Sequence, residues 1–321
     1  MSTPRRVVVL DTGYDHYDTE RAILGPLRAE VVVRPCDRDA AKVVEAVRDA
    51  DAALVRESPV TAAAIAGAPA LKAIVRYGIG IDNIDLEAAR ARRIFVANVP
   101  DYGSEEVSDQ ALALLYGVVR RVAARDRAVR EGAWNVSRHE RMYRVAGRTL
   151  GLVGYGRIAR AFERKMRGCG VARVLVSDPY AAPEPGIEIV DLDTLCREAD
   201  YISVHAPLVP ETRHLIDRRR IALMKPTAIL VNTARGPLVD EEALTEALAA
   251  GRIFGAGIDV YEHEPPHRDH PLFRLSNVVV SDHTGWYSEE SVAELQSKAA
   301  EEVARVFRGE RPRHWVNPWP A

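Results

Sequence analysis

Short apolar runs alternate with amphipathic segments along most of the chain. In the first hundred residues, such runs predict strands at residues 7–10, 31–33, 52–55, 73–75 and 94–97. Between them, the segments 40–48 and 86–91 predict helices. Alternation of this kind is typical of βαβ units, so the N-terminal part is expected to form a parallel sheet covered by helices.

A second alternating series starts at residue 149. Its predicted strands are residues 149–153, 174–177, 201–204, 228–232, 255–259 and 278–281. A helix predicted over 241–250 ends at Gly251, and a last helix over 288–308 ends at Gly309. Six parallel strands with intervening helices have the size of a complete dinucleotide-binding domain. The sequence therefore predicts an α/β protein with two lobes.

The segment that joins the two series is predicted to be one long helix over residues 104–130. Its apolar positions follow the 3.6-residue period of a helix at residues 107, 111, 114, 115, 118 and 122. After it comes an irregular stretch, 132–148, that is rich in arginine and aromatic residues.

Composition narrows the class of protein and its partners. The chain has 321 residues, of which 47% are hydrophobic and 28% are charged, as in ordinary globular proteins. A net charge of −2 gives no support for nonspecific nucleic-acid binding. The three cysteines form no C-x-x-C pair, and no apolar run reaches the length of a membrane span. We therefore expect a cytoplasmic protein that binds neither nucleic acid nor membrane.

A glycine-rich turn lies between the first two strands of the second series. Gly154, Gly156 and Ala159 form a G-x-G-x-x-A pattern that opens a predicted helix. Gly156 lets the backbone approach a pyrophosphate, and Ala159 lets the helix pack on the strand. Asp178 ends the next strand about twenty residues later, where an acid binds the adenosine ribose. This acid would repel a 2′-phosphate, so NAD is favoured over NADP. The alternative to nucleotide binding is a βαβ unit in which these residues serve packing alone.

Three later strands end in residues that suit the oxidation of an alcohol. Arg235 could bind a carboxylate, although an ordinary loop arginine is the plainer interpretation. Asp259 could hold the nicotinamide carboxamide and Glu264 could orient a histidine, or both could belong to a solvated acidic loop. His283 could be a general acid/base, because imidazole titrates near neutral pH, or a structural histidine. Their occurrence together at strand ends favours a catalytic site.

The first series contains one further candidate site, at residues 76–85. Gly78 and Gly80 follow a predicted strand, and their N–H groups could bind a carboxylate, with Arg76 adding a positive charge. The alternative is a simple glycine turn between a strand and a helix.

Three histidines in the loop after residue 262 are possible metal ligands. His263, His267 and His270 are spread across a proline-containing loop and share no helical face. We therefore expect no metal site.

Motifs along nearly the whole chain point together to one known family. They are RYGIGIDNID (76–85), ANVPDYGSEEVSDQALALL (97–115), GLVGYGRIA (151–159), SDPY (177–180), HAPLVPETRHLID (205–217), VNTARGPLVDEEAL (231–244) and GIDVYEHEP (257–265). With them the sequence resembles the D-isomer-specific 2-hydroxyacid dehydrogenases. Residues 283–289 look like the branch that contains the C-terminal binding proteins. Ser108 and Gln110 depart from the Ala and His of many relatives, and Glu264 disfavours a formate dehydrogenase, which carries Gln.

The resemblance implies an architecture. A Rossmann coenzyme domain, 99–287, would be inserted into a smaller flavodoxin-like substrate-binding domain made of 1–98 and 288–321. It also implies a homodimer, with residues 104–148 in the interface.

The resemblance also implies roles for individual residues. Arg235 would bind substrate, Glu264 would be the partner acid, and His283 the acid/base. The residues implied to contact NAD are Gly154, Gly156, Arg157, Ile158, Asp178, His205, Thr212, Thr233, Ala234 and Asp259. Those implied to contact the substrate are Arg76, Gly78, Ile79, Gly80 and Trp286.

The expected reaction is reversible hydride transfer between NAD(H) and C2 of a small 2-hydroxy or 2-oxo acid. Two alternatives stay open. One is an NAD(H)-sensing interaction protein of the corepressor type with vestigial catalysis. The other is a dehydrogenase whose acid carries a phosphonate or sulfonate group as a second anion.

Overall fold

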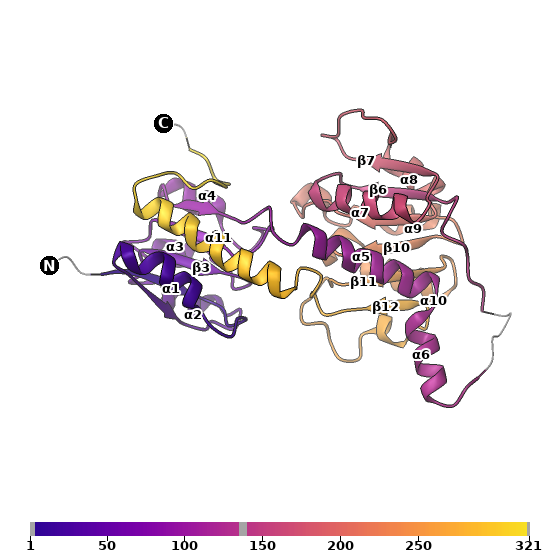
Figure 1. Ribbon diagram of the computed structural model, residues 1–321, viewed down its shortest axis with the longest axis horizontal. Coiled ribbons are helices and arrows are strands. Elements are labelled where there is room, and N and C mark those ends of the chain that lie inside the picture. The colour runs from indigo at the N-terminus through magenta and orange to yellow at the C-terminus, as the bar shows by residue number, and fades with distance from the viewer. Residues whose placement is uncertain (1–3, 135–139, 320–321) are drawn as a thin grey trace. The chain divides into compact units, whose positions relative to one another are not determined.

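The computed structural model describes residues 4–134 and 140–319. The chain divides into two compact units (Figure 1). Unit 1 consists of Met1–Tyr102 with Ser288–Ala321, and unit 2 of Gly103–Tyr287. Among the described residues, no helix is both long enough and apolar enough to cross a bilayer.

Unit 1 is a five-stranded parallel sheet with helices on both faces. Its strands are β1 (Arg5–Val9), β2 (Ala29–Val33), β3 (Ala52–Val55), β4 (Ala73–Arg76) and β5 (Phe95–Ala97). They lie in the order β2-β1-β3-β4-β5, which is the flavodoxin-like order. The helical elements are α1 (Asp18–Leu24), η1 (Gly25–Leu27), α2 (Ala40–Val47), α3 (Ala62–Ala66), α4 (Leu86–Ala91) and α11 (Glu289–Phe307).

The C-terminal helix α11 returns to unit 1 and packs beside α1, as Figure 1 shows. It begins where the sequence predicts, because the Ser288 hydroxyl accepts a hydrogen bond from the N–H of Ser291 and caps the first turn. Helices α2, α3 and α4 pack on the sheet, and their buried apolar residues form one hydrophobic core with those of the strands. Helix α11 is therefore part of the same unit as α1, although the two lie far apart in the sequence.

Unit 2 is a seven-stranded parallel sheet of the Rossmann type. Its strands are β6 (Thr149–Val153), β7 (Arg173–Ser177), β8 (Glu188–Ile189), β9 (Tyr201–Val204), β10 (Ile229–Asn232), β11 (Gly255–Ile258) and β12 (Val278–Val280). The order β12-β11-β10-β9-β6-β7-β8 reverses direction between β6 and β9. In such sheets a ligand binds at the carboxyl ends of the strands, at this point of reversal.

Helices cover both faces of this sheet and form two apolar cores. Residues of α5 and α7 contribute to one core, and residues of α8, α9 and α10 to the other. The helical elements are α5 (Ser104–Val119), α6 (Val122–Arg130), α7 (Arg157–Gly168), α8 (Leu192–Glu198), η2 (Pro210–Thr212), α9 (Arg218–Leu223), η3 (Gly236–Leu238), α10 (Glu241–Ala249) and η4 (Pro271–Arg274).

The prediction of one long helix over 104–130 is wrong. The helix is interrupted at Arg120 and Arg121, and Arg121 adopts a left-handed conformation with φ of 52°. The apolar period fits α5, where Val118 is buried, but it fails at Val122, which is 57% exposed. No residue of α6 is buried, so no core packing keeps it in line with α5.

The strand β8 is absent from the sequence-based prediction. It has two residues, both exposed, so no apolar run marks it. Part of the predicted dimer segment 104–148, residues 135–139, lies outside the described residues.

Candidate active site

The glycine turn after β6 has the backbone geometry that the sequence suggests. Gly154 has φ of +86°, and a Cβ there would lie 2.7 Å from the amide nitrogen of Ala206. Gly156 precedes α7, and a Cβ there would meet no atom within 4 Å. Ala159 is fully buried between the helix and the sheet. The turn is thus closed on its protein side and open where a pyrophosphate would approach the start of α7.

Asp178 lies directly after β7 and faces the glycine turn. One carboxylate oxygen accepts a hydrogen bond of 2.7 Å from the N–H of Tyr155, and the other one of 2.8 Å from the N–H of Tyr180. The backbone thus fixes the acid beside the turn, in the position that suits recognition of a ribose hydroxyl.

Buried polar atoms without a partner lie at the carboxyl ends of β9 and β10. Within the described part of the chain, His205 Nε2 and Thr233 Oγ1 have no hydrogen-bond partner. Burial lowers the pKa of His205 to about 3, so its ring is neutral. Unpaired buried polar groups are costly, and a bound ligand can satisfy them. These atoms, together with the open turn at Gly156, fit a dinucleotide.

Two other predicted NAD contacts already have protein partners. The Thr212 hydroxyl donates to the carbonyl of Pro207 at 2.7 Å and accepts from the N–H of Val209 at 2.8 Å. The N–H of Ala234 donates to Asn232 Oδ1 at 3.1 Å. Arg157 and Ile158 are the first residues of α7, where N–H groups are left without partners in the helix.

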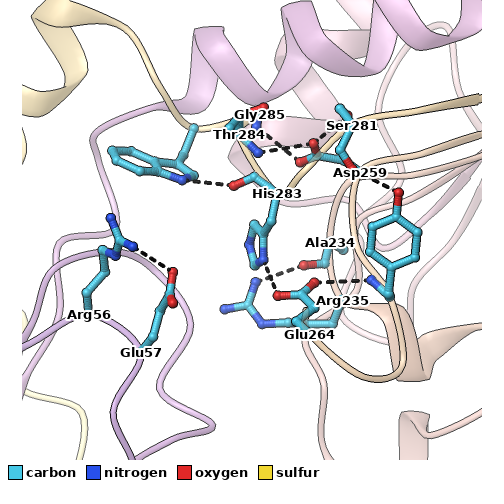
Figure 2. Close-up of polar contacts among 12 residues, drawn as sticks. Arg56, Glu57, Ala234, Arg235, Asp259, Glu264, Ser281, His283, Thr284 and Gly285 are labelled. Carbon is cyan, nitrogen blue, oxygen red and sulfur yellow. Dashed lines mark hydrogen bonds and ion pairs between the residues drawn. The ribbon is translucent and has the colours of Figure 1, made fainter. Parts of the chain in front are cut away.

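His283 and Glu264 form a hydrogen-bonded pair, drawn in Figure 2. Glu264 Oε2 lies 2.7 Å from His283 Nδ1, and Glu264 Oε1 accepts a bond of 3.1 Å from the N–H of Tyr261. Burial alone would raise the pKa of the Glu264 carboxyl. The bond to His283, the Tyr261 N–H and the charge of Arg235 outweigh burial and lower this pKa below its ordinary value. Glu264 therefore places a negative charge directly beside the imidazole of His283.

Arg235 approaches the same pair from the end of β10. Figure 2 shows its guanidinium group beside the Glu264 carboxylate and the His283 ring. Its Nη1 donates to the carbonyl of Ala234 at 2.8 Å, which helps to orient the side chain. The next residue, Gly236, packs so closely that a Cβ would lie 1.9 Å from the carbonyl carbon of Tyr261. The loops that carry Arg235 and Glu264 are thus in direct contact.

Asp259 anchors the loop that carries His283. The Asp259 side chain is 1% exposed and accepts hydrogen bonds from the Ser281 hydroxyl at 2.6 Å and from the N–H groups of Thr284 and Gly285. Its carbonyl accepts from the N–H of His283 at 2.8 Å. Asp259 therefore fixes the backbone on both sides of the imidazole.

Gln110 and Trp286 extend this network. Gln110 Nε2 donates to the Ser281 hydroxyl at 2.8 Å, so the departure noted in the sequence joins the Asp259 network. Trp286 Nε1 donates to the carbonyl of His283 at 3.0 Å. Sequence reasoning missed Ser281 and Tyr261 as supporting residues, because their only signal is a position next to a candidate residue.

The predicted carboxylate-binding turn lies in unit 1. Gly78 has φ of +139°, and its N–H donates to the carbonyl of Arg76 at 3.0 Å. The Ile79 carbonyl accepts from Asn98 at 2.7 Å. Within the described ranges, no hydrogen bond uses the N–H of Ile79 or Gly80, so these two N–H groups can bind an anion.

The histidines of the late loop do not gather into a metal site. His263 and His267 are exposed, while His270 lies 2.8 Å from Glu241. Among residues 4–134 and 140–319, no group of three or more His, Cys, Asp or Glu side chains is arranged to hold a metal ion.

The fold and the glycine turn define a dinucleotide-binding enzyme, and comparison with known proteins identifies its family. The family model described as the D-isomer specific 2-hydroxyacid dehydrogenase NAD binding domain matches residues 112–285. The chain is 43% identical over 283 residues to a glyoxylate reductase of Korarchaeum cryptofilum, covering 86% of this chain and 85% of that protein. The chain belongs to the D-isomer specific 2-hydroxyacid dehydrogenase family, and its cofactor is NAD.

Two further relatives extend the comparison. A D-3-phosphoglycerate dehydrogenase of Methanocaldococcus jannaschii is 40% identical over 282 residues, but the chain spans only 53% of that protein. A D-lactate dehydrogenase of Aquifex aeolicus, solved with NAD and lactic acid, has a TM-score of 0.88 at 25% identity and covers 98% of this chain and 100% of that one.

Proposed function

We propose that this enzyme reduces small 2-oxo acids of the glyoxylate type to 2-hydroxy acids with NADH, and catalyses the reverse oxidation with NAD. The observation that carries the proposal is the convergence of Arg235, Glu264 and His283 from three separate strand ends. Relatives named glyoxylate reductase match over 85% and 86% of their length, whereas the match to a named phosphoglycerate dehydrogenase covers 53% of that protein.

His283 acts as the acid/base. Its Nδ1 bonds to Glu264 at 2.7 Å, which leaves Nε2 to protonate the developing alkoxide or to take the hydroxyl proton in reverse. Glu264 stabilises the imidazolium between these steps. When bound, NAD(H) supplies the hydride acceptor or donor.

Arg235 is the substrate-binding residue proposed in unit 2. The guanidinium group of Arg235 pairs with the substrate carboxylate and polarises the reacting carbonyl. The N–H groups of Ile79 and Gly80, with the charge of Arg76, are the carboxylate-binding groups proposed in unit 1. Trp286 is a substrate-binding residue proposed in unit 2. The support is that both N–H groups lack partners within the described chain.

The coenzyme contacts follow the turn and the ends of β7, β9, β10 and β11. They are proposed for Gly154, Gly156, Arg157, Ile158, Asp178, His205, Thr212, Thr233, Ala234 and Asp259. The support is the open backbone at Gly156 and the unpartnered buried atoms of His205 and Thr233.

A substrate with a second anionic group is the alternative that a specific observation favours. In unit 1, the buried Tyr14 hydroxyl has no partner within the described residues, and the charges of Arg56 and Arg76 both act on it. Arg56 also pairs with Glu57 at 3.1 Å (Figure 2). Two guanidinium groups beside one hydroxyl suit a phosphate, phosphonate or sulfonate.

A homodimer formed through residues 104–148 is also proposed. Its support is three exposed apolar side chains in one segment: Val122 and Val129 of α6 and the later Trp134 are 57%, 51% and 88% exposed. Exposed apolar side chains in one segment are typical of an interface. Light scattering on the purified protein should give twice the mass of one chain, and a monomer would contradict the proposal.

The deciding experiment measures NADH consumption with glyoxylate, pyruvate, hydroxypyruvate and a phosphorylated 2-oxo acid. Turnover of the small acids supports the proposal, and a preference for the phosphorylated acid supports the alternative. NADH binding without turnover of any acid would instead support NAD(H) sensing of the corepressor type.

A further inference from the structure

Two glutamates on different segments of unit 2 hold each other's backbone. Glu241 is the first residue of α10, and Glu262 lies in the loop that follows β11. The N–H of Glu241 donates to Glu262 Oε1 at 3.3 Å, and the N–H of Glu262 donates to Glu241 Oε2 at 3.2 Å. This reciprocal pair ties the start of α10 to the loop.

Each glutamate also pairs with a histidine. His214 Nε2 lies 2.8 Å from Glu262 Oε1, and His270 Nε2 lies 2.8 Å from Glu241 Oε1. His270 Nδ1 accepts from the N–H of Leu272, so a neutral ring carries its hydrogen on Nε2 and donates it to Glu241. We name Glu241, Glu262, His214 and His270 together the glutamate brace.

Most of the brace is shielded from solvent. The side chains of Glu241, Glu262 and His270 are 18%, 18% and 15% exposed. The guanidinium group of Arg213 lies 3.7 Å from Glu262 Oε2 and brings a positive charge to the brace. Hydrogen bonds that involve charged groups in such a setting are stronger than those at an open surface.

The brace connects the segments that carry Arg235 and Glu264. Glu262 precedes Glu264 by two positions. The N–H of Tyr261, the residue directly before Glu262, donates a hydrogen bond of 3.1 Å to the Glu264 carboxylate. On the other side, α10 follows Arg235 through η3, and the N–H of His214 donates to the carbonyl of Pro237 in η3 at 2.8 Å. Three loops of unit 2 therefore meet at the brace.

We propose that the glutamate brace fixes the position of Glu264 relative to Arg235 and His283, which makes Glu262 and Glu241 positioning residues of the active site. The inference rests on the proposed function of Arg235, Glu264 and His283. Small displacements of a catalytic group lower turnover strongly, because the reacting atoms leave their aligned geometry.

The test compares Glu262→Ala with Glu262→Gln and with Glu242→Ala as a matched control. Glu242 is the next residue of α10 and is exposed, so its removal takes away a carboxylate without touching the brace. In Glu262→Ala we expect kcat for a 2-oxo acid to fall about 10-fold, while the affinity for NADH changes less than about 2-fold. Glu262→Gln keeps an acceptor for the N–H of Glu241, so its kcat should stay within about 3-fold of wild type.

The pH profile separates positioning from a general loss of structure. The pKa of Glu264 is lowered in the intact site by its bonds to His283 and the Tyr261 N–H and by the charge of Arg235, against burial. Weakening these bonds in Glu262→Ala raises the pKa of Glu264, so the acidic limb of activity should move to higher pH. A kcat within about 2-fold of wild type together with an unmoved acidic limb would overturn the proposal.

Two further measurements keep the test decisive. If Glu262→Ala is unfolded at the assay temperature, the same measurements are made on His214→Ala. We expect its kcat to fall about 3-fold, because the His214 ring is 37% exposed and makes one of the brace contacts. A crystal structure of the folded variant should show the 2.7 Å contact between His283 and Glu264 opened, and an unchanged contact would contradict positioning. This structural measurement needs no turnover. Failure of the proposed function would be seen as an inactive wild type, and it can therefore be told apart from failure of the positioning proposal.

Discussion

Replacing Glu264 with Gln measures how much the reaction depends on the carboxylate charge. The Glu264 side chain is 22% exposed, and its bond of 2.7 Å to the imidazole is largely shielded from water. A charge-assisted bond of this kind contributes about 1.5–3 kcal/mol. Since about 1.4 kcal/mol corresponds to a tenfold change in rate, we expect kcat/KM to fall about 10- to 100-fold. Gln still offers an oxygen to the Tyr261 N–H, so NADH binding should change little.

The assay is NADH oxidation by a 2-oxo acid under steady-state conditions, at several pH values, with Glu242→Gln as the control for loss of an exposed carboxylate. The control should match wild type. A Glu264→Gln enzyme that keeps kcat/KM within about 3-fold of wild type would refute the reasoning that the carboxylate stabilises the imidazolium.

Three other predictions concern coenzyme choice, packing and pH. Asp178→Ser should lower the preference for NAD over NADP at least about 10-fold in kcat/KM, because it removes a charge that repels a 2′-phosphate; an unchanged preference would contradict that role. Gly236→Ala should destabilise the fold by about 2–4 kcal/mol in thermal melts, because its Cβ would overlap Tyr261, whereas Gly168→Ala, with no atom near its Cβ, should not. The lowered pKa of Glu264 means that its carboxylate contributes stability above its ordinary pKa of 4.5, and this contribution is lost as pH falls through the lower folded value. The difference in melting temperature between wild type and Glu264→Gln should therefore shrink below that pH.

Most of the fold follows from local patterns in the sequence. The helix α4 occupies the predicted residues 86–91, and α11 begins after the Ser288 cap at the predicted start. The strands β6 and β9 also match, because buried parallel strands are short continuous apolar runs between turn signals. Where packing agrees with the local pattern, sequence reasoning is sufficient.

The errors occur where a local pattern continues but packing ends. The apolar spacing extends from α5 to Val122, yet no core receives that side chain, and the helix ends at Val119. The prediction misses β8 for the opposite reason. This strand forms by pairing with β7, although its residues make no apolar run.

The candidate site shows the same division. Arg235, Glu264 and His283 could be named because each lies in the segment that follows a strand, and parallel strands bring their carboxyl ends together. The glutamate brace could not be found this way. Its contacts, such as those between Glu241 and Glu262, depend on how separate segments meet in space.

The most direct test of the central claim is the rate of hydride transfer from NADH to glyoxylate, measured by stopped-flow absorbance in His283→Ala and Arg235→Ala. We expect each variant to bind NADH within about 2-fold of wild type and to transfer hydride at least about 100-fold more slowly. Near-normal transfer in either variant would contradict the assignment of these side chains to the reaction.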